Sequence, residues 1–184
     1  MCVASLIASV GLLRTPATAA EPPPLAEHQI KALYLFNFTK YVDWPGPATA
    51  TNGTPFIIGI LDAPELRGDL QEITRGKRIH GREILVRTVA TTQDVKACQL
   101  VFIGATDKPR IAALLKATQD LAVLTVGEAG NFLTQGGIIN FVRQENKLRV
   151  EISLDAARRA RLVVSAKLLA VAKAVKGRPE APIN

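Results

Sequence analysis

The chain has 184 residues, of which 48% are hydrophobic and 21% are charged, and its formal net charge is +7. This length favours one domain with a substantial core, and the composition excludes both an intrinsically disordered chain and an integral membrane protein. The positive charge is compatible with an acidic protein partner, an anionic lipid surface or nucleic acid.

The N-terminus has the pattern of a secretory signal peptide. An apolar run too short to span a bilayer covers residues 3–13, and the small residues Ala17 and Ala19 follow it. We therefore predict a signal peptide over residues 1–19 and an exported mature chain without direct membrane insertion. In an exported protein nucleic acid becomes the least favoured partner. Residues 20–28 contain three consecutive prolines and are predicted to form a flexible, extended N-terminus.

Cysteine and histidine are too few to build a disulfide or a metal site. After removal of the signal peptide Cys98 is the only cysteine, so no intramolecular disulfide can form, and we expect this thiol to be a small buried hydrophobe. The two histidines, His28 and His80, lie far apart in the sequence. We predict neither a metal nor a cofactor.

The first predicted element is a helix that begins at Gln29 and ends before Pro45, which follows the only tryptophan. One face is predicted from residues at helical spacing, namely Ile30, Leu33, Tyr34, Asn37, Phe38 and Tyr41. Leu35 and Phe36 add apolar surface on the other side. The helix is therefore expected to be covered on more than one side, either by the core or in part by a partner or a second subunit.

Strand and helix patterns then alternate along the chain. Strands are predicted over residues 56–61, 83–89, 100–103 and 122–126, and helices over residues 62–74, 91–98 and 108–118, with a basic turn at residues 75–82. Asp107 or the residue before it is predicted to cap the third helix. This order is typical of βαβ units with parallel strands.

The C-terminal part is predicted to contain a hairpin and two helices. Residues 138–143 and 148–154 form the hairpin, with Arg149, Glu151 and Ser153 on a solvated side. Asp155 is expected to cap a helix at residues 156–160, and Ser165 another at residues 166–175. The fold class is thus α/β: a single three-layer domain over residues 29–176, in which helices flank a mixed sheet of about six strands. The sheet has a parallel core and a C-terminal antiparallel hairpin, and residues 177–184 form a tail.

Four segments carry a family pattern. The first is a hydrophobic helix that ends at residues 41–45, which include Tyr41 and Trp44. The other three follow in the same order as in the family, at residues 124–127, 136–141 and 165–169. Together these segments resemble the YfiR/HmsC-like family of periplasmic proteins. The matching motif residues are expected to be structural: Tyr41, Val42, Trp44, Pro45, Gly136 and Gly137.

The resemblance implies a regulator that binds the periplasmic domain of a membrane-bound diguanylate cyclase and holds it inactive. Such binding lowers cyclic di-GMP and restrains biofilm formation. The candidate partner surface is the solvated side of the hairpin, Arg149 and Glu151, with Ile139 or Phe141 if one of these is exposed, together with the spare apolar face of the first helix. Ordinary solvent exposure or core packing is the alternative explanation for each of these residues. A homodimer built by the first helix is a further possibility.

A different class of function remains open, a periplasmic sensor module that binds a small ligand and works with a transporter or a sensor kinase. Ligands of open α/β sheets settle beyond the carboxyl ends of the parallel strands, where Asp62, Thr106, Asp107 and Glu128 are placed. The sequence shows no nucleotide-binding, nucleophile or zinc-protease motif, so we do not expect an enzyme.

Overall fold

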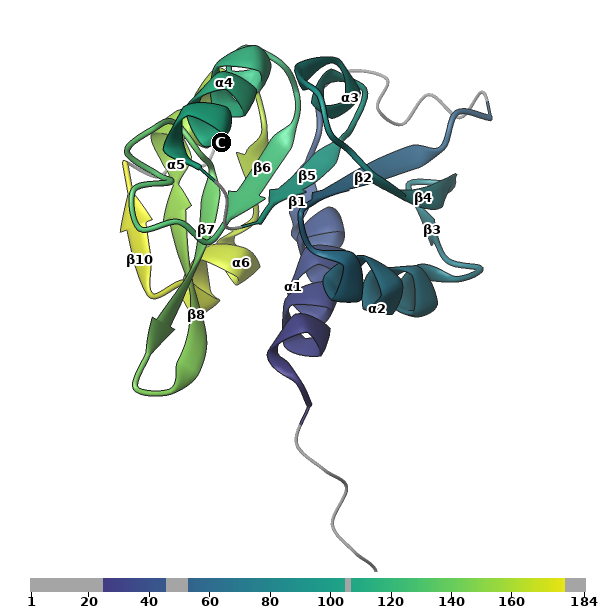
Figure 1. The fold of residues 1–184 in the computed structure, drawn as a ribbon, viewed down its shortest axis with the longest axis horizontal. Coiled ribbons are helices and arrows are strands. Elements are labelled where there is room, and N and C mark those ends of the chain that lie inside the picture. Colours follow the sequence, from purple (N-terminus) through teal and green to yellow (C-terminus); the bar gives the residue numbers. More distant parts are fainter. Residues whose placement is uncertain (1–24, 46–52, 105–106, 178–184) are drawn as a thin grey trace, which may run out of the picture.

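A mixed sheet of eight strands forms the centre of the protein (Figure 1). The computed structural model describes residues 25–45, 53–104 and 107–177, so the predicted signal peptide lies outside the described residues. Across the sheet the strand order is β10-β8-β7-β6-β5-β2-β4-β3. The sheet confirms the predicted mixed α/β fold, with two more strands than expected.

The parallel core of the sheet consists of five strands. They are β2 (Phe56–Leu61), β4 (Arg82–Thr88), β5 (Leu100–Ile103), β6 (Leu124–Gly127) and β7 (Ile139–Gln144). Continuous apolar runs in β2 and β5 are buried on both faces of the sheet, as is usual for parallel strands. These strands therefore lie where the sequence places them.

Short strands complete the two edges of the sheet. β8 (Lys147–Ser153) runs antiparallel to β7 and forms the predicted hairpin, and β10 (Ala174–Lys176) pairs with β8 in parallel. At the other edge β3 (Arg78–Ile79) is antiparallel to β4. A separate two-stranded sheet joins β1 (Val42–Asp43) to β9 (Val163–Val164).

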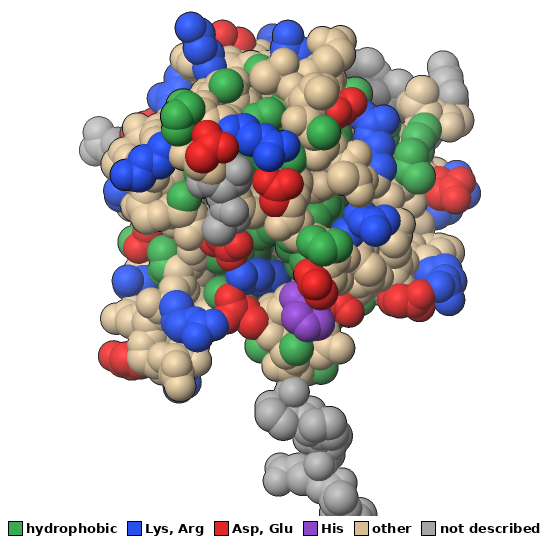
Figure 2. Space-filling model, viewed as in Figure 1, with side chains coloured by type: hydrophobic (Ala, Val, Ile, Leu, Met, Phe, Trp, Pro, Cys, Tyr) green, Lys and Arg blue, Asp and Glu red, His purple; other side chains and the backbone are tan. Residues whose placement is uncertain are grey.

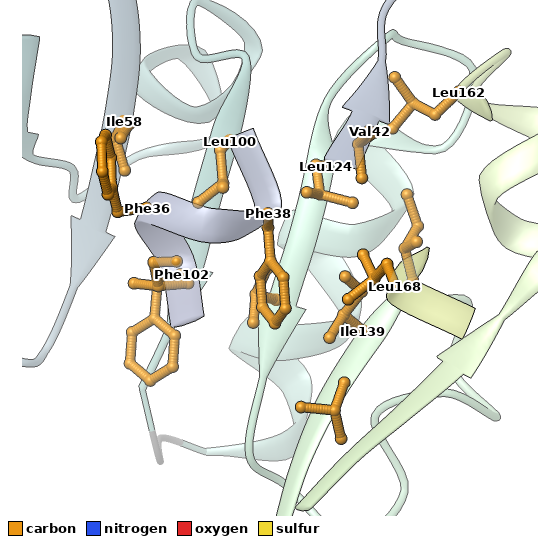
Figure 3. Close-up of a cluster of buried hydrophobic side chains, with 14 of the residues drawn as sticks. Phe36, Phe38, Val42, Ile58, Leu100, Phe102, Leu124, Ile139, Leu162 and Leu168 are labelled. Carbon is orange, nitrogen blue, oxygen red and sulfur yellow. The ribbon is translucent and has the colours of Figure 1, made fainter. Parts of the chain in front are cut away.

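Helices cover both faces of the sheet. On one face the core contains side chains of α1 (Glu27–Tyr41), α2 (Pro64–Thr74), α5 (Leu154–Arg159) and α6 (Ala166–Val171). The opposite core contains side chains of α3 (Thr92–Lys96) and α4 (Lys108–Thr118). Figure 3 shows Phe36 and Phe38 of α1 among Leu100, Phe102 and Ile139 of the sheet. The domain therefore has the predicted three layers.

The buried side of α1 differs from the prediction. Its buried residues are Ala32, Leu35, Phe36, Phe38 and Thr39. Leu33 is 40% exposed and Tyr41 37% exposed, so the predicted face was largely wrong. α1 is apolar on several sides, and a helical repeat alone does not say which side meets the sheet.

Three further local predictions also need correction. The chain leaves helical geometry at Ala172 and enters β10, so α6 ends at Val171 and not at residue 175. The N-cap of α5 is Ser153, whose hydroxyl accepts a hydrogen bond from the Ala156 N–H (3.3 Å), and not Asp155. The predicted basic turn at residues 75–82 contains the short strand β3. Pairing with β4 holds these two residues in an extended conformation. The predicted caps Asp107 and Ser165 are confirmed.

Candidate functional site

The β7–β8 hairpin projects from the lower end of the sheet (Figure 1). Two of its four candidate partner residues are not available at the surface, because Ile139 is 0% exposed and Phe141 is 2% exposed. The Phe141 ring lies 6.0 Å from the Phe38 ring and 5.8 Å from the Tyr34 ring, measured between centroids. Packing against α1 therefore corrects the prediction and assigns both residues to the core.

The remaining two candidates differ in their surroundings. Arg149 is exposed, whereas the Glu151 carboxylate lies 3.7 Å from the Lys173 ammonium and is 23% exposed. β10 pairs with Glu151 along the outer edge of β8. Fewer residues of the hairpin are therefore exposed to solvent than the alternating pattern predicts. The pattern does not show that β10 lies beside β8 and partly covers Glu151.

Basic side chains gather at the tip of the hairpin. Arg143, Lys147 and Arg149 are exposed there, and Glu145 is the acidic residue among them. Glu145 and Asn146 form the turn in left-handed conformations, with φ of 49° and 59°. Arg143 ion-pairs with Glu27 at the start of α1. This cluster is visible in the sequence as three cations around a polar turn. Our predicted partner surface omitted two of them, Arg143 and Lys147.

Glu128, one of the predicted crevice residues, forms an ion pair with α1. Its carboxylate pairs with the Lys31 ammonium, which also lies 2.8 Å from the Glu27 carboxylate. The Lys31 side chain is only 13% exposed. Glu128 thus fastens the end of β6 to α1.

The carboxyl ends of β2 and β5 meet where the order of parallel strands reverses. β2 is followed in the chain by β4 on one side and then by β5 on the other. Asp62 and Asp107 both contact Arg110 here, through the guanidinium at 3.0 Å and the backbone N–H at 2.9 Å respectively. Thr106 lies outside the described residues. Two of the four predicted crevice residues therefore contact the same residue, Arg110, which the sequence analysis missed: Asp62 pairs with its guanidinium, and Asp107 caps α4 through its backbone N–H.

A hollow of about 150 Å³ opens beside this ion pair. Its lining comes from the ends of β2 and β4 and the start of α2: Ile60, Asp62, Ala63, Pro64, Arg67 and Thr88. Arg67 and Thr88 supply a cation and a hydroxyl. The hollow can hold a small polar molecule. Within the described part of the chain no group of His, Cys, Asp and Glu is arranged to hold a metal ion.

Among the motif residues, Trp44 has the clearest structural contacts. Trp44 is 9% exposed, its ring meets the Phe56 ring edge-on at 5.1 Å, and its indole N–H donates to the Gln99 carbonyl at 3.1 Å. Gly136 has a φ of 100°, a conformation that suits glycine. Val42 is buried, while Tyr41 and Pro45 are exposed.

Two ionisable groups around α3 have shifted pKa values. Burial raises the pKa of the Cys98 thiol, which is 2% exposed and behaves as the predicted small hydrophobe. Backbone hydrogen bonds from Ala90 and then Thr91 lower the pKa of Asp94. Cys98 packs in the core beneath α3 and α4, and Asp94 accepts the hydrogen bonds that cap α3, so both groups contribute to stability.

The fold defines a single mixed α/β domain. A sequence model of the YfiR/HmsC-like family matches residues 28–173, and the chain belongs to this family. Family membership indicates a periplasmic regulator of cyclic di-GMP signalling. A comparison with curated proteins gives no significant match. No helix in the described ranges is both long and apolar enough to cross a bilayer.

Two solved structures share the fold at low sequence identity. One is a conserved domain protein from Vibrio cholerae O1 biovar El Tor str. N16961, with a TM-score of 0.54 and 13% identity, covering 83% of this chain and 61% of that chain. The other is an ABC domain in complex with L-Trp from Streptococcus pneumonia, with a TM-score of 0.52 and 11% identity, covering 80% of this chain and 60% of that one. This chain therefore spans less than two thirds of either protein, and the likeness is one of fold.

Proposed function

We propose that the protein is a periplasmic regulator that represses a membrane-bound diguanylate cyclase by binding its periplasmic domain. Repression lowers cyclic di-GMP and limits biofilm formation. The observation that carries this proposal is the match to the YfiR/HmsC-like family over residues 28–173. Cleavage of the predicted signal peptide, residues 1–19, releases the chain into the periplasm.

Repression of this kind requires binding and no catalysis. A regulator that binds the inactive conformation of a receptor more tightly than the active one shifts the receptor towards the inactive state. A tenfold difference in affinity shifts that equilibrium by about 1.4 kcal/mol. An exposed binding surface is therefore sufficient.

The surface that best fits this role is the basic face at the tip of the hairpin, Lys147 and Arg149 with Glu151 at its border, since Arg143 lies on the opposite face and pairs with Glu27. It projects from the sheet, and its charges favour an acidic patch on the partner. Opposite charge on the partner would speed association and would make binding sensitive to salt.

The first experiment measures cellular cyclic di-GMP in the native host with the gene intact, deleted, and restored on a plasmid. Deletion should raise the level and restoration should lower it. An unchanged level would refute repression. Restoration with Arg149→Glu should fail, whereas the matched control Lys116→Glu, an exposed lysine on α4, should succeed. If both variants restore the cyclic di-GMP level equally, the hairpin tip is not part of the binding surface.

A second candidate function is a small-ligand sensor that works with a transporter or a sensor kinase. The hollow beside Asp62 and Arg67 favours it, because it lies at the strand ends where open α/β sheets bind ligands. A thermal-shift screen of small polar metabolites, with L-Trp included, tests this function. A saturable shift that Arg67→Ala abolishes would support the sensor, and the absence of any shift would count against it.

A further inference from the structure

A groove runs between α1 and α2 on the outer side of the helical layer. Its volume is about 350 Å³. Leu25, Gln29 and Leu33 line one wall at intervals of four residues, and Asp69, Glu72 and Ile73 line the other. Gln29 and Leu33 lie about one turn apart on α1, roughly 6 Å along its axis at 1.5 Å per residue, and Leu25 precedes the helix, which begins at Glu27.

The α1 wall of this groove carries apolar side chains that are open to solvent. Leu25 is 57% exposed and Leu33 is 40% exposed, although both are large hydrophobic residues. Over the described residues, only seven large hydrophobic side chains are exposed, and these two share one groove. Apolar residues that are gathered in a groove indicate a binding surface more strongly than scattered ones do.

The charge of the groove is opposite to that of the protein. Both charged residues of its lining are acidic, Asp69 and Glu72, whereas the whole chain carries +7. The neighbouring His28 contacts Asp69 and Arg75 contacts Glu72, each from outside the lining. In Figure 2 acidic and hydrophobic side chains lie side by side over the lower part of the α1 and α2 pair. The groove therefore combines apolar contact with attraction for a cation.

We propose that this groove binds an amphipathic helix of a partner protein, with apolar residues at i and i+4 and flanking Lys or Arg. Two packed helices leave a groove of the shape that receives a third helix, whose apolar residues enter between the ridges. The acidic wall of α2 selects the basic flanks. A second copy of this chain fits less well, because a twofold contact through the groove would bring the acids of the two copies together. The proposal goes beyond the repressor function and does not depend on it.

Two synthetic helical peptides with the same leucine pattern test the proposal, one with lysine flanks and one with glutamate flanks. Fluorescence anisotropy with the mature protein should show binding of the lysine peptide that is at least about tenfold tighter, a difference of about 1.4 kcal/mol. Added salt should reduce that difference. Equal affinities, or no binding of either peptide, would overturn the proposal.

Variants locate the peptide on the protein. Leu33→Asp should weaken binding of the lysine peptide by about tenfold or more, whereas Leu85→Asp, at a leucine that is 45% exposed on β4, should leave it unchanged. Circular dichroism checks that both variants fold. If Leu33→Asp does not fold, Glu72→Lys on the surface of α2 gives the same test and should reverse the preference between the peptides. Equal loss in the Leu85 variant, or a concentration-dependent dimer that Leu33→Asp abolishes, would overturn the proposal.

Discussion

Trp44 connects the end of α1 to the sheet through a ring contact and a hydrogen bond. Substitutions at this position can measure how much each of the two contributes to stability. Its ring is 91% buried and meets Phe56 edge-on, and its indole N–H donates to the Gln99 carbonyl. Trp44→Ala removes the ring and leaves a cavity, so we expect it to lower the free energy of unfolding by about 3–5 kcal/mol. That is a large part of the roughly 5–15 kcal/mol that holds a typical domain.

Trp44→Phe should cost much less, about 1–2 kcal/mol. The phenylalanine ring keeps most of the contact with Phe56 and loses one hydrogen bond, which contributes about 1 kcal/mol. The Gln99 carbonyl also accepts the Leu124 N–H at 2.8 Å, so the substitution leaves no buried acceptor unpaired.

Urea unfolding followed by far-ultraviolet circular dichroism measures both variants, because Trp44 is the only tryptophan and its fluorescence is lost in them. Tyr41→Phe is the control from the same motif and should change stability by less than about 0.5 kcal/mol. If Trp44→Phe costs as much as Trp44→Ala, the hydrogen bond and not the packing is the main contribution of this residue. If Trp44→Ala costs less than about 1 kcal/mol, the packing argument fails.

Three further predictions concern stability and reactivity. A Cβ at Gly137 would lie 2.2 Å from the Phe132 ring, so Gly137→Ala should lower the free energy of unfolding by about 1–3 kcal/mol. Gly68→Ala in α2, where a Cβ meets nothing within 4 Å, should raise it by about 0.5–1 kcal/mol, and urea midpoints that move in the same direction would contradict this pair. Because hydrogen bonds lower the pKa of Asp94, its contribution to stability is present above the unfolded value of about 3.9 and disappears as pH falls through the folded value. Asp94→Asn should therefore reduce stability at pH 7 more than at pH 3, and equal losses at both pH values would refute this assignment. Burial raises the pKa of the Cys98 thiol, so iodoacetamide at pH 8 should modify this thiol in urea and not in the folded protein. Mass spectrometry measures the modification. Rapid modification of the folded protein would contradict the burial.

The central elements of the fold were predictable because each carries its own local signal. β2 and β5 are continuous apolar runs of strand length, and α4 begins with an aspartate cap and a proline in its first turn. β3 and β10 have two and three residues, and they exist through pairing with β4 and β8. β10 pairs with a segment that is distant in the chain, which its own sequence does not show, whereas β3 pairs with β4 across the short turn of His80 and Gly81 and is too short to show an alternating pattern.

The surface of the hairpin was predictable only in part for a related reason. Alternation along β7 and β8 separates two faces, but the presence of α1 over one face decides which is buried. Phe141 consequently meets Phe38 and Tyr34, while Arg149 stays exposed. The groove of α1 and α2 was not visible at all, because it depends on how the two helices pack.

The first turn of α1 links the hairpin tip to this groove. Glu27 pairs with both Arg143 and Lys31, and Leu25 and Gln29 beside it line the groove. If the proposed helix binds there, it contacts the same turn that holds the hairpin. Binding of the lysine-flanked peptide should then slow amide hydrogen exchange in residues 143–149, and Glu27→Gln should abolish that slowing without preventing binding. Hairpin exchange that stays the same when the peptide binds would show that the two surfaces act independently.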